Sequence, residues 1–196
     1  MVKIMYTISE NVKNEIIIKN SRFITIIAKI KTKEEAISIL NQVKKDYPKA
    51  THYCYTYKIG ETIKKAEDDG EPSSTAGLPM LNVLEKEDIT NVIAITIRYF
   101  GGIKLGASGL IRAYSKSVKE ALNKAQIQEL IKAVICDITF PYTKEKEITY
   151  KIPKENILNK TYLETITYRI ITPKDNLLLT RYQTTLIEES YIEKRK

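Results

Sequence analysis

Glycine is confined to one part of this chain, and that confinement constrains the fold more than any other sequence feature. All seven glycines of the 196 residues lie between Gly60 and Gly109, and four of them fall in the run Arg98–Gly109. Glycine lowers the cost of a positive φ angle and lets another backbone or a ligand approach closely. We therefore expect the run Arg98–Gly109 to form a tight loop.

The flanks of this loop predict a strand before it and a helix after it. Val92–Ile97 is apolar apart from Thr96, which is typical of a central strand buried on both faces. Gly109–Ala125 has apolar residues at helical spacing, and Ser108 is the expected N-cap. A strand, a glycine-rich bend and a helix can hold an anion against backbone N–H groups, or can simply turn a corner in a packed domain. Neither the P-loop string nor the dinucleotide fingerprint GxGxxG occurs, so no cofactor is predicted.

Basic side chains are concentrated beside the predicted loop. Between Arg98 and Lys124 there are six basic residues and one acid, Glu120, in a chain whose net charge is +8. A solvated helix face explains such a stripe by default, but the neighbouring glycine loop favours an anion or nucleic-acid site. The residues expected to bind an anion or nucleic acid are Arg98, Gly101, Gly102, Lys104, Gly106, Ser108, Gly109, Arg112, Lys116 and Lys119.

Composition narrows the class of protein. The hydrophobic fraction of 43% and the charged fraction of 29% are typical of a soluble globular protein. No apolar run approaches the roughly 20 residues needed to span a bilayer, and the first residues do not resemble a signal peptide. We therefore expect a cytoplasmic protein without a membrane partner. One histidine, His52, and two distant cysteines, Cys54 and Cys136, predict neither a disulfide framework nor a metal site.

The segment before the glycine-rich part predicts a strand, a helix and a second strand. Residues 15–31 are rich in β-branched types. Thr32 is the expected N-cap of a helix that ends at Pro48, with Glu35 at capping-box spacing. Thr51–Ile59 alternates as a strand does, and one face carries a stripe of tyrosines that is either a half-buried sheet face or a base-stacking surface. The stripe consists of Tyr53, Tyr55 and Tyr57.

Residues Glu61–Pro79 predict a long polar loop, followed by a short helix over Met80–Leu84. Loops of this length inside a compact domain are usually functional or disordered. The acidic run Glu67–Glu71 lacks the spacing of an EF-hand and is better interpreted as an exposed turn than as a cation site. A hydrolase using the loop hydroxyls would need His52 as its base, and no orienting partner for His52 is evident in the sequence.

After Gln126 the pattern changes to one that predicts a second, smaller domain. The order is strand, helix, two strands, helix and strand, which is the ferredoxin-like order. We expect one domain over residues 1–130 and another over 131–196. The predicted elements are Val134–Phe140, Pro141–Tyr150, Leu158–Ile171 with a break near Glu164, Asn176–Ile187 and Glu189–Lys196.

Three strings together resemble the YigZ/Impact family. They are His52-Tyr-Cys54, then Asp68-Asp-Gly-Glu-Pro-Ser-Ser-Thr-Ala-Gly77-Leu-Pro, then Arg98-Tyr-Phe-Gly-Gly-Ile-Lys-Leu-Gly106 with Gly109-Leu-Ile-Arg-Ala-Tyr114. The order and spacing match over roughly residues 15–125. The resemblance marks a composite family-motif surface made of His52, Cys54, Asp68, Asp69, Gly70, Glu71, Pro72, Ser73, Thr75, Gly77, Tyr99 and Tyr114.

The resemblance implies a fold of class α/β (α+β) and an involvement in translation. The first domain should be similar to the second domain of ribosomal protein S5, and the second should be ferredoxin-like. The leading expectation is a non-enzymatic protein associated with RNA or the ribosome. One alternative is an enzyme that acts on a small anionic substrate in a cleft formed by His52, the Asp68–Thr75 loop and the Gly101–Gly109 loop. Another is a protein-interaction module, because eukaryotic Impact proteins regulate translation by competing for a protein partner.

Overall fold

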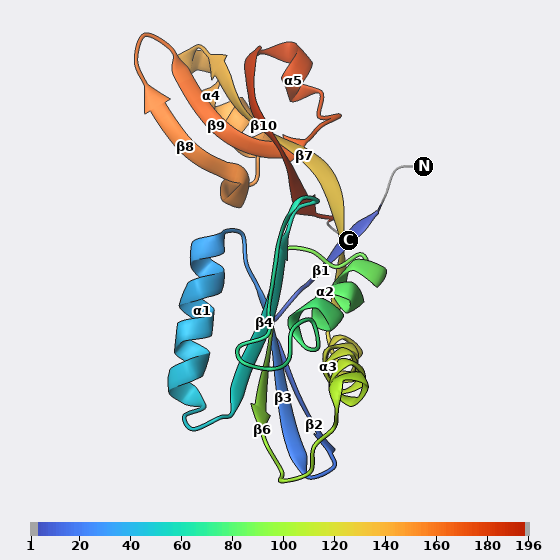
Figure 1. Cartoon of the computed structure of the whole chain (residues 1–196). Helices are drawn as coiled ribbons and strands as arrows, with labels where there is room; N and C mark the ends of the chain where they lie inside the picture. The colour runs from blue at the N-terminus through green and yellow to red at the C-terminus, as the bar shows by residue number, and fades with distance from the viewer. Residues whose placement is uncertain (1–3, 195–196) are drawn as a thin grey trace. The chain divides into compact units, whose positions relative to one another are not determined.

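The computed structural model describes residues 4–194, and contacts divide the chain into two compact units between Glu129 and Leu130. The last two residues of the predicted terminal strand, 195 and 196, lie outside the described part. Each unit combines helices with an antiparallel sheet (Figure 1), so the predicted α/β (α+β) class is confirmed. No helix within residues 4–194 is long and apolar enough to cross a membrane.

The first unit is built on a five-stranded antiparallel sheet with helices on both faces (Figure 1). A short strand, β1 (Met5–Ile8), precedes this sheet. Helix α1 covers one face, and α2 and α3 pack against the other. In spatial order the strands are β2 (Val12–Ile18), β3 (Ser21–Lys29), β6 (Val92–Tyr99), β4 (His52–Ile59) and β5 (Ile63–Glu67). The helices are α1 (Lys33–Asp46), α2 (Gly77–Lys86) and α3 (Ala107–Leu122).

Strand β6 lies at the centre of the sheet, as its mainly apolar sequence predicts. Val92 and Ala94 point into the core beneath α2 and α3, whereas Ile93, Ile95 and Ile97 point into the core beneath α1. All five side chains are fully buried. A strand with helices on both sides has no solvent-facing position, and even its polar residues Thr96 and Arg98 are buried.

The helix and strand predicted over residues 32–59 are confirmed in detail. The Thr32 hydroxyl accepts the Glu35 N–H at 3.2 Å, which satisfies one free donor of the first turn of α1. The tyrosine stripe of β4 faces the core beneath α1: Tyr57 is buried and Tyr53 is half-buried. The Tyr53 hydroxyl donates to the Tyr47 carbonyl at 2.6 Å. The stripe is therefore a sheet face packed by its own domain.

Two local predictions were wrong in the glycine-rich half of this unit. Residues Glu61–Pro79 do not form one long loop, because β5 pairs with β4 and α2 begins at Gly77. Ser108 is not an N-cap: the N-cap position is Gly106, and Ser108 is exposed in the first turn of α3 without a capping hydrogen bond. The positive φ of Gly106, +71°, lets the chain enter the helix from a conformation that serine would resist.

The second unit has the ferredoxin-like element order. Its strand order is β10-β7-β9-β8, and all of these pairings are antiparallel. A separate core of buried residues lies between this sheet and its helices. The predicted helix over Asn176–Ile187 was wrong for most of its length, because the helix is a single turn and a strand follows it. The elements are β7 (Ile127–Phe140), η1 (Tyr142–Lys144), α4 (Glu145–Lys151), η2 (Lys154–Asn156), β8 (Ile157–Tyr162), β9 (Ile166–Pro173), α5 (Leu178–Arg181) and β10 (Gln183–Glu193).

Candidate functional site

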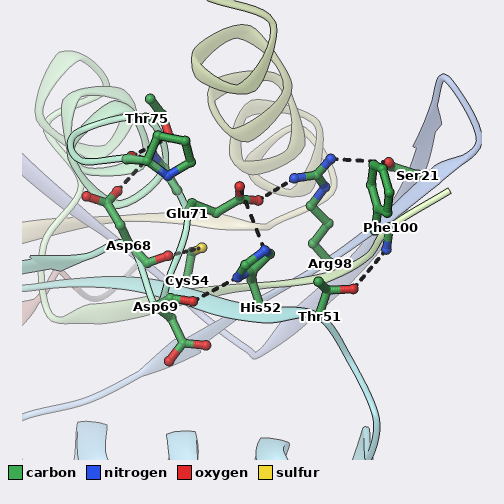
Figure 2. A network of polar contacts seen from close by, with 12 residues as sticks. Ser21, Thr51, His52, Cys54, Asp68, Asp69, Glu71, Thr75, Arg98 and Phe100 are labelled. Atoms are coloured by element: carbon green, nitrogen blue, oxygen red, sulfur yellow. Dashed lines mark hydrogen bonds and ion pairs between the residues drawn. The ribbon is translucent and has the colours of Figure 1, made fainter. Parts of the chain in front are cut away.

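Residues from the three motif strings meet in one polar network at one end of the first unit's sheet (Figure 2). Strands β4 and β6 pair so that His52 lies opposite Arg98. The loop after β5 folds back over the start of β4, where the His52 Nδ1 atom lies 2.8 Å from the Asp69 carbonyl oxygen. Tyr114 reaches the network from α3 through Glu71. The fold therefore joins side chains that are far apart in the sequence.

Glu71 is the centre of this network. Its side chain is 3% exposed, and its Oε1 atom accepts hydrogen bonds from Arg98 Nη1 at 2.6 Å and from the Tyr114 hydroxyl at 2.7 Å. Its Oε2 atom lies 3.9 Å from His52 Nε2. A buried carboxylate is costly unless it is paired and hydrogen-bonded. The two short bonds to Oε1 supply this compensation.

Arg98 does not fit the predicted phosphate contact, because it is 4% exposed and its charge is used inside the protein. Besides Glu71 it contacts the Ser21 hydroxyl through Nη2 at 3.4 Å. Its guanidinium carbon lies 5.4 Å from the ring centroids of both Phe23 and Phe100, so the cation contacts two aromatic rings. Its Nε atom is buried without a hydrogen-bond partner among the described residues.

Cys54 and Tyr114 are buried hydrogen-bonding members of the network. The Cys54 thiol donates to the Asp68 carbonyl oxygen at 2.9 Å, and its sulfur lies 3.3 Å from the Tyr114 hydroxyl. Burial raises the pKa of the Cys54 thiol well above its usual range. Burial also raises the pKa of the Tyr114 hydroxyl, with a further contribution from neighbouring Cys54. A reactive cysteine needs the thiolate, so this thiol is not poised for nucleophilic chemistry.

The Asp68 and Asp69 carboxylates of the acidic loop form hydrogen bonds with backbone N–H groups of the first unit, and these bonds fix the loop. The Asp68 Oδ1 atom accepts the N–H groups of Ala76 and Gly77 at 2.9 and 2.8 Å, which binds the free donors at the start of α2. The Asp69 Oδ2 atom accepts the Tyr53 N–H at 2.7 Å. No group of three or more His, Cys, Asp or Glu side chains within residues 4–194 is arranged to hold a metal ion.

The other motif residues divide between the surface and the interior. Gly70, Pro72 and Ser73 are exposed on the loop, whereas Thr75 is buried and donates to the Pro72 carbonyl at 2.6 Å. Tyr99 is half-buried, with its hydroxyl 3.3 Å from the Pro48 carbonyl oxygen. Most of the predicted family-motif surface is therefore buried, and only a small part of it is exposed. We call the buried hydrogen-bonded network of Cys54, Glu71, Arg98 and Tyr114 the brace.

A pocket of about 400 Å³ in this unit lies away from the brace. Of the predicted site residues only Lys119 lines it, and it is formed mainly by the C-terminal end of α3 and the residues that follow. Its lining is Tyr6, Glu87, Ile89, Lys119, Leu122, Asn123, Ala125 and Ile127. This pocket is therefore not the cleft predicted between His52 and the two motif loops.

Four of the predicted basic residues remain on the surface. Lys104 is in the glycine loop and Arg112, Lys116 and Lys119 are on α3, and all four are exposed. Among the described residues none of them forms an ion pair with a carboxylate, whereas several exposed lysines elsewhere do. Spacings of three and four residues place the α3 cations on neighbouring positions of one helical side. We call these four residues the basic surface.

The glycine loop lies beside the basic surface and is anchored by close backbone packing. A Cβ atom on Gly101 would collide with the backbone of Asn20 in the β2–β3 turn. The Gly101 N–H donates to the Ser21 hydroxyl at 3.2 Å. Gly102 has a φ of +84° with open space around it. Glycine is therefore favoured at this position by the backbone conformation and not by close packing. The first turn of α3 contains no acidic residue, which leaves its positive dipole end uncompensated.

Sequence reasoning missed two residues of this site. Ser21 bonds both Arg98 and Gly101, and Phe100 lies against the Arg98 guanidinium with 46% of its surface exposed. In the sequence, Phe100 could have been identified as a candidate because it is an aromatic residue next to the glycine pair Gly101-Gly102. No local signal identifies Ser21, because its partners depend on the pairing of β3 with β6.

Comparison with known proteins identifies the family. The model of the Impact N-terminal domain matches residues 19–122. The IMPACT family member YvyE of Bacillus subtilis is 43% identical over 180 residues, which cover 84% of this chain and 82% of that protein. The IMPACT family member YigZ of Escherichia coli is 38% identical over 115 residues, or 57% of this chain and 56% of that protein. The chain therefore belongs to the Impact family.

A solved structure extends the likeness to both units. The crystal structure of a hypothetical protein aligns with 96% of this chain and 99% of its own, with a TM-score of 0.76 and 27% sequence identity. The family resemblance predicted from the three motif strings is thus confirmed in sequence and in fold.

Proposed function

We propose that this protein binds RNA through the basic surface and the adjoining glycine loop, in a role connected with translation. The observation that carries the proposal is the set of four exposed cations, Lys104, Arg112, Lys116 and Lys119, without a carboxylate partner in the described part of the chain. Phosphate neutralisation by lysine and arginine supplies most of the sequence-independent affinity for nucleic acid. The free N–H groups at the start of α3 add further anion-binding capacity.

The buried brace supports the proposal by fixing this surface. Glu71 links Arg98 of β6 to Tyr114 of α3, and Ser21 links Arg98 to the glycine loop. Cations presented by a rigid support lose less conformational entropy on binding than those of a mobile segment. The buried motif residues Glu71, Arg98 and Tyr114 therefore contribute by positioning, while the exposed cations Lys104, Arg112, Lys116 and Lys119 make the contacts.

A salt titration with matched variants tests the proposal. Binding of a fluorescently labelled single-stranded RNA of twelve nucleotides is measured by anisotropy at several salt concentrations. The double variant Arg112→Ala/Lys116→Ala should weaken binding and reduce the slope of log K against log salt by about 1.4, since each lost phosphate contact contributes roughly 0.7 for single strands. The control Lys33→Ala/Lys45→Ala removes the same charge from α1, on the opposite face of the sheet, and should leave most of the slope in place.

Two results would contradict the proposal. If the wild-type protein binds no RNA at low salt, the proposed RNA-binding function is wrong. Equal loss of affinity and slope in the α1 and α3 variants would show that net charge, and not the basic surface, is responsible. In that case the α3 assignment is wrong.

A further inference from the structure

Phe100 is an exposed aromatic residue at the start of the glycine loop, which also carries the exposed side chains of Ile103 and Lys104. It follows β6 directly, precedes Gly101 and Gly102, and is 46% exposed. Single exposed apolar residues are common on soluble proteins and need no special explanation. Phe100 differs from them because its backbone is hydrogen-bonded and its ring lies against a buried cation.

Two contacts hold Phe100. Its backbone N–H donates to the Thr51 hydroxyl at 3.0 Å, and the centroid of its ring lies 5.4 Å from the guanidinium carbon of Arg98. Arg98 is itself held by Glu71 and Ser21, and Figure 2 shows the Phe100 ring standing beside this buried guanidinium. An aromatic side chain held in one orientation loses little entropy when a flat ligand stacks on it.

Positive charge adjoins the ring along the chain. Lys104 is four residues further in the same loop, and Arg112 follows in α3. Four residues span at most about 14 Å of extended chain, so the Lys104 backbone cannot lie farther than this from that of Phe100. An exposed ring with a cation nearby is a combination by which proteins bind single-stranded nucleic acid, because bases stack on the ring and phosphates meet the cation.

We propose that Phe100 is a stacking platform for an unpaired base, so that the substrate of the basic surface is single-stranded RNA. This inference rests on the proposed RNA-binding function and adds that the bound RNA is single-stranded. Bases of an A-form duplex are stacked on one another and present no free face, whereas unpaired bases can be splayed onto an aromatic side chain. The buried Arg98 supports the ring from the protein side.

The absence of tryptophan from the chain provides a direct test. In the variant Phe100→Trp the new indole is the sole tryptophan, and a base stacking on it should quench its fluorescence. The full-length variant is titrated with single-stranded oligouridine of twelve nucleotides, and with duplex RNA of the same length. We expect quenching by the single strand and little by the duplex. The control variant Tyr150→Trp places the reporter on the second unit at a residue that is 93% exposed, and it should not be quenched.

A second variant removes the π face and keeps the apolar bulk. Phe100→Leu should weaken single-strand binding roughly tenfold, leave duplex binding unchanged and leave the salt slope unchanged, because stacking and phosphate contacts are separate contributions. Anisotropy of the labelled RNA measures all three. This variant also tests the inference if the tryptophan variant fails to fold, which circular dichroism will show.

The failures can be told apart. If wild-type protein binds RNA but Phe100→Trp is not quenched and Phe100→Leu binds as tightly as wild type, then stacking is overturned and the basic surface remains. If no RNA binds, the proposed function itself has failed. If polyglutamate quenches Phe100→Trp as strongly as oligouridine does, then the patch binds acidic protein segments and the inference is overturned.

Discussion

At the scale of single residues, Arg98 and Lys104 show how differently two cations of one motif can be used. Both belong to the string that carries the family resemblance, yet Arg98 is 4% exposed and Lys104 is exposed. Arg98 compensates a buried glutamate and supports two aromatic rings, whereas Lys104 has no carboxylate partner in the described part of the chain. Substitutions at the two positions should therefore have different consequences.

Removing Arg98 should destabilise the first unit strongly. Arg98→Leu leaves the Glu71 carboxylate buried without its cation, and breaking a buried pair in this way costs about 3–5 kcal/mol. The measurement is the free energy of unfolding from urea denaturation. Arg22→Leu breaks the exposed Glu15–Arg22 pair of the same sheet and serves as the control, with little change expected. A similar loss of unfolding free energy in both variants would show that the buried Glu71–Arg98 pair stabilises the first unit no more than an exposed pair does.

At the scale of the elements, the strands and helices with a clear apolar period could be predicted, and the contacts between them could not. The buried strand over Val92–Ile97 and the helix capped by Thr32 follow from local patterns. The burial of Arg98 follows from its pairing opposite His52 and from a loop that delivers Glu71, neither of which is encoded nearby in the sequence. Sequence periodicity reports which face is apolar, but it does not report which polar residue will find an internal partner.

The beginning of α3 illustrates the same limit. Serine is a common N-cap, so propensity favoured Ser108, but the chain enters the helix through Gly106 at a positive φ. The glycine loop before it is held at Gly101 by packing against the β2–β3 turn. Tertiary contact thus overrode local propensity at this element boundary.

Two adjacent glycines of the loop should respond differently to alanine. In Gly101→Ala the added Cβ meets the backbone of Asn20, and relieving this overlap requires the glycine loop and the β2–β3 turn to separate, at a cost of about 3 kcal/mol or more. In Gly102→Ala the space is open and only the positive φ is penalised, at about 1 kcal/mol. Urea denaturation measures both. A larger loss for Gly102→Ala would show that conformation, and not close approach, determines the need for glycine here.

At the scale of the whole molecule, the hydrophobic cores of the two units have no residue in common. The first unit contains two clusters, one on each side of its sheet, and the second unit contains its own cluster around Phe140 and Tyr168. All of the residues in the basic surface and in the brace belong to the first unit. The second unit is therefore not needed to build the proposed RNA site, and its stability need not be linked to that of the first.

Matched cavity substitutions should reveal two independently stable units. Leu84 and Ile148 are fully buried in the first and second unit respectively, and truncation of such residues to alanine costs about 2–5 kcal/mol. Hydrogen exchange followed by mass spectrometry of peptides reports the local cost of opening. In Ile148→Ala, exchange should accelerate in β7, β9 and β10 and stay unchanged in β3, β4 and β6, and Leu84→Ala should show the reverse. Acceleration throughout the chain in either variant would mean that the two cores unfold as one cooperative structure.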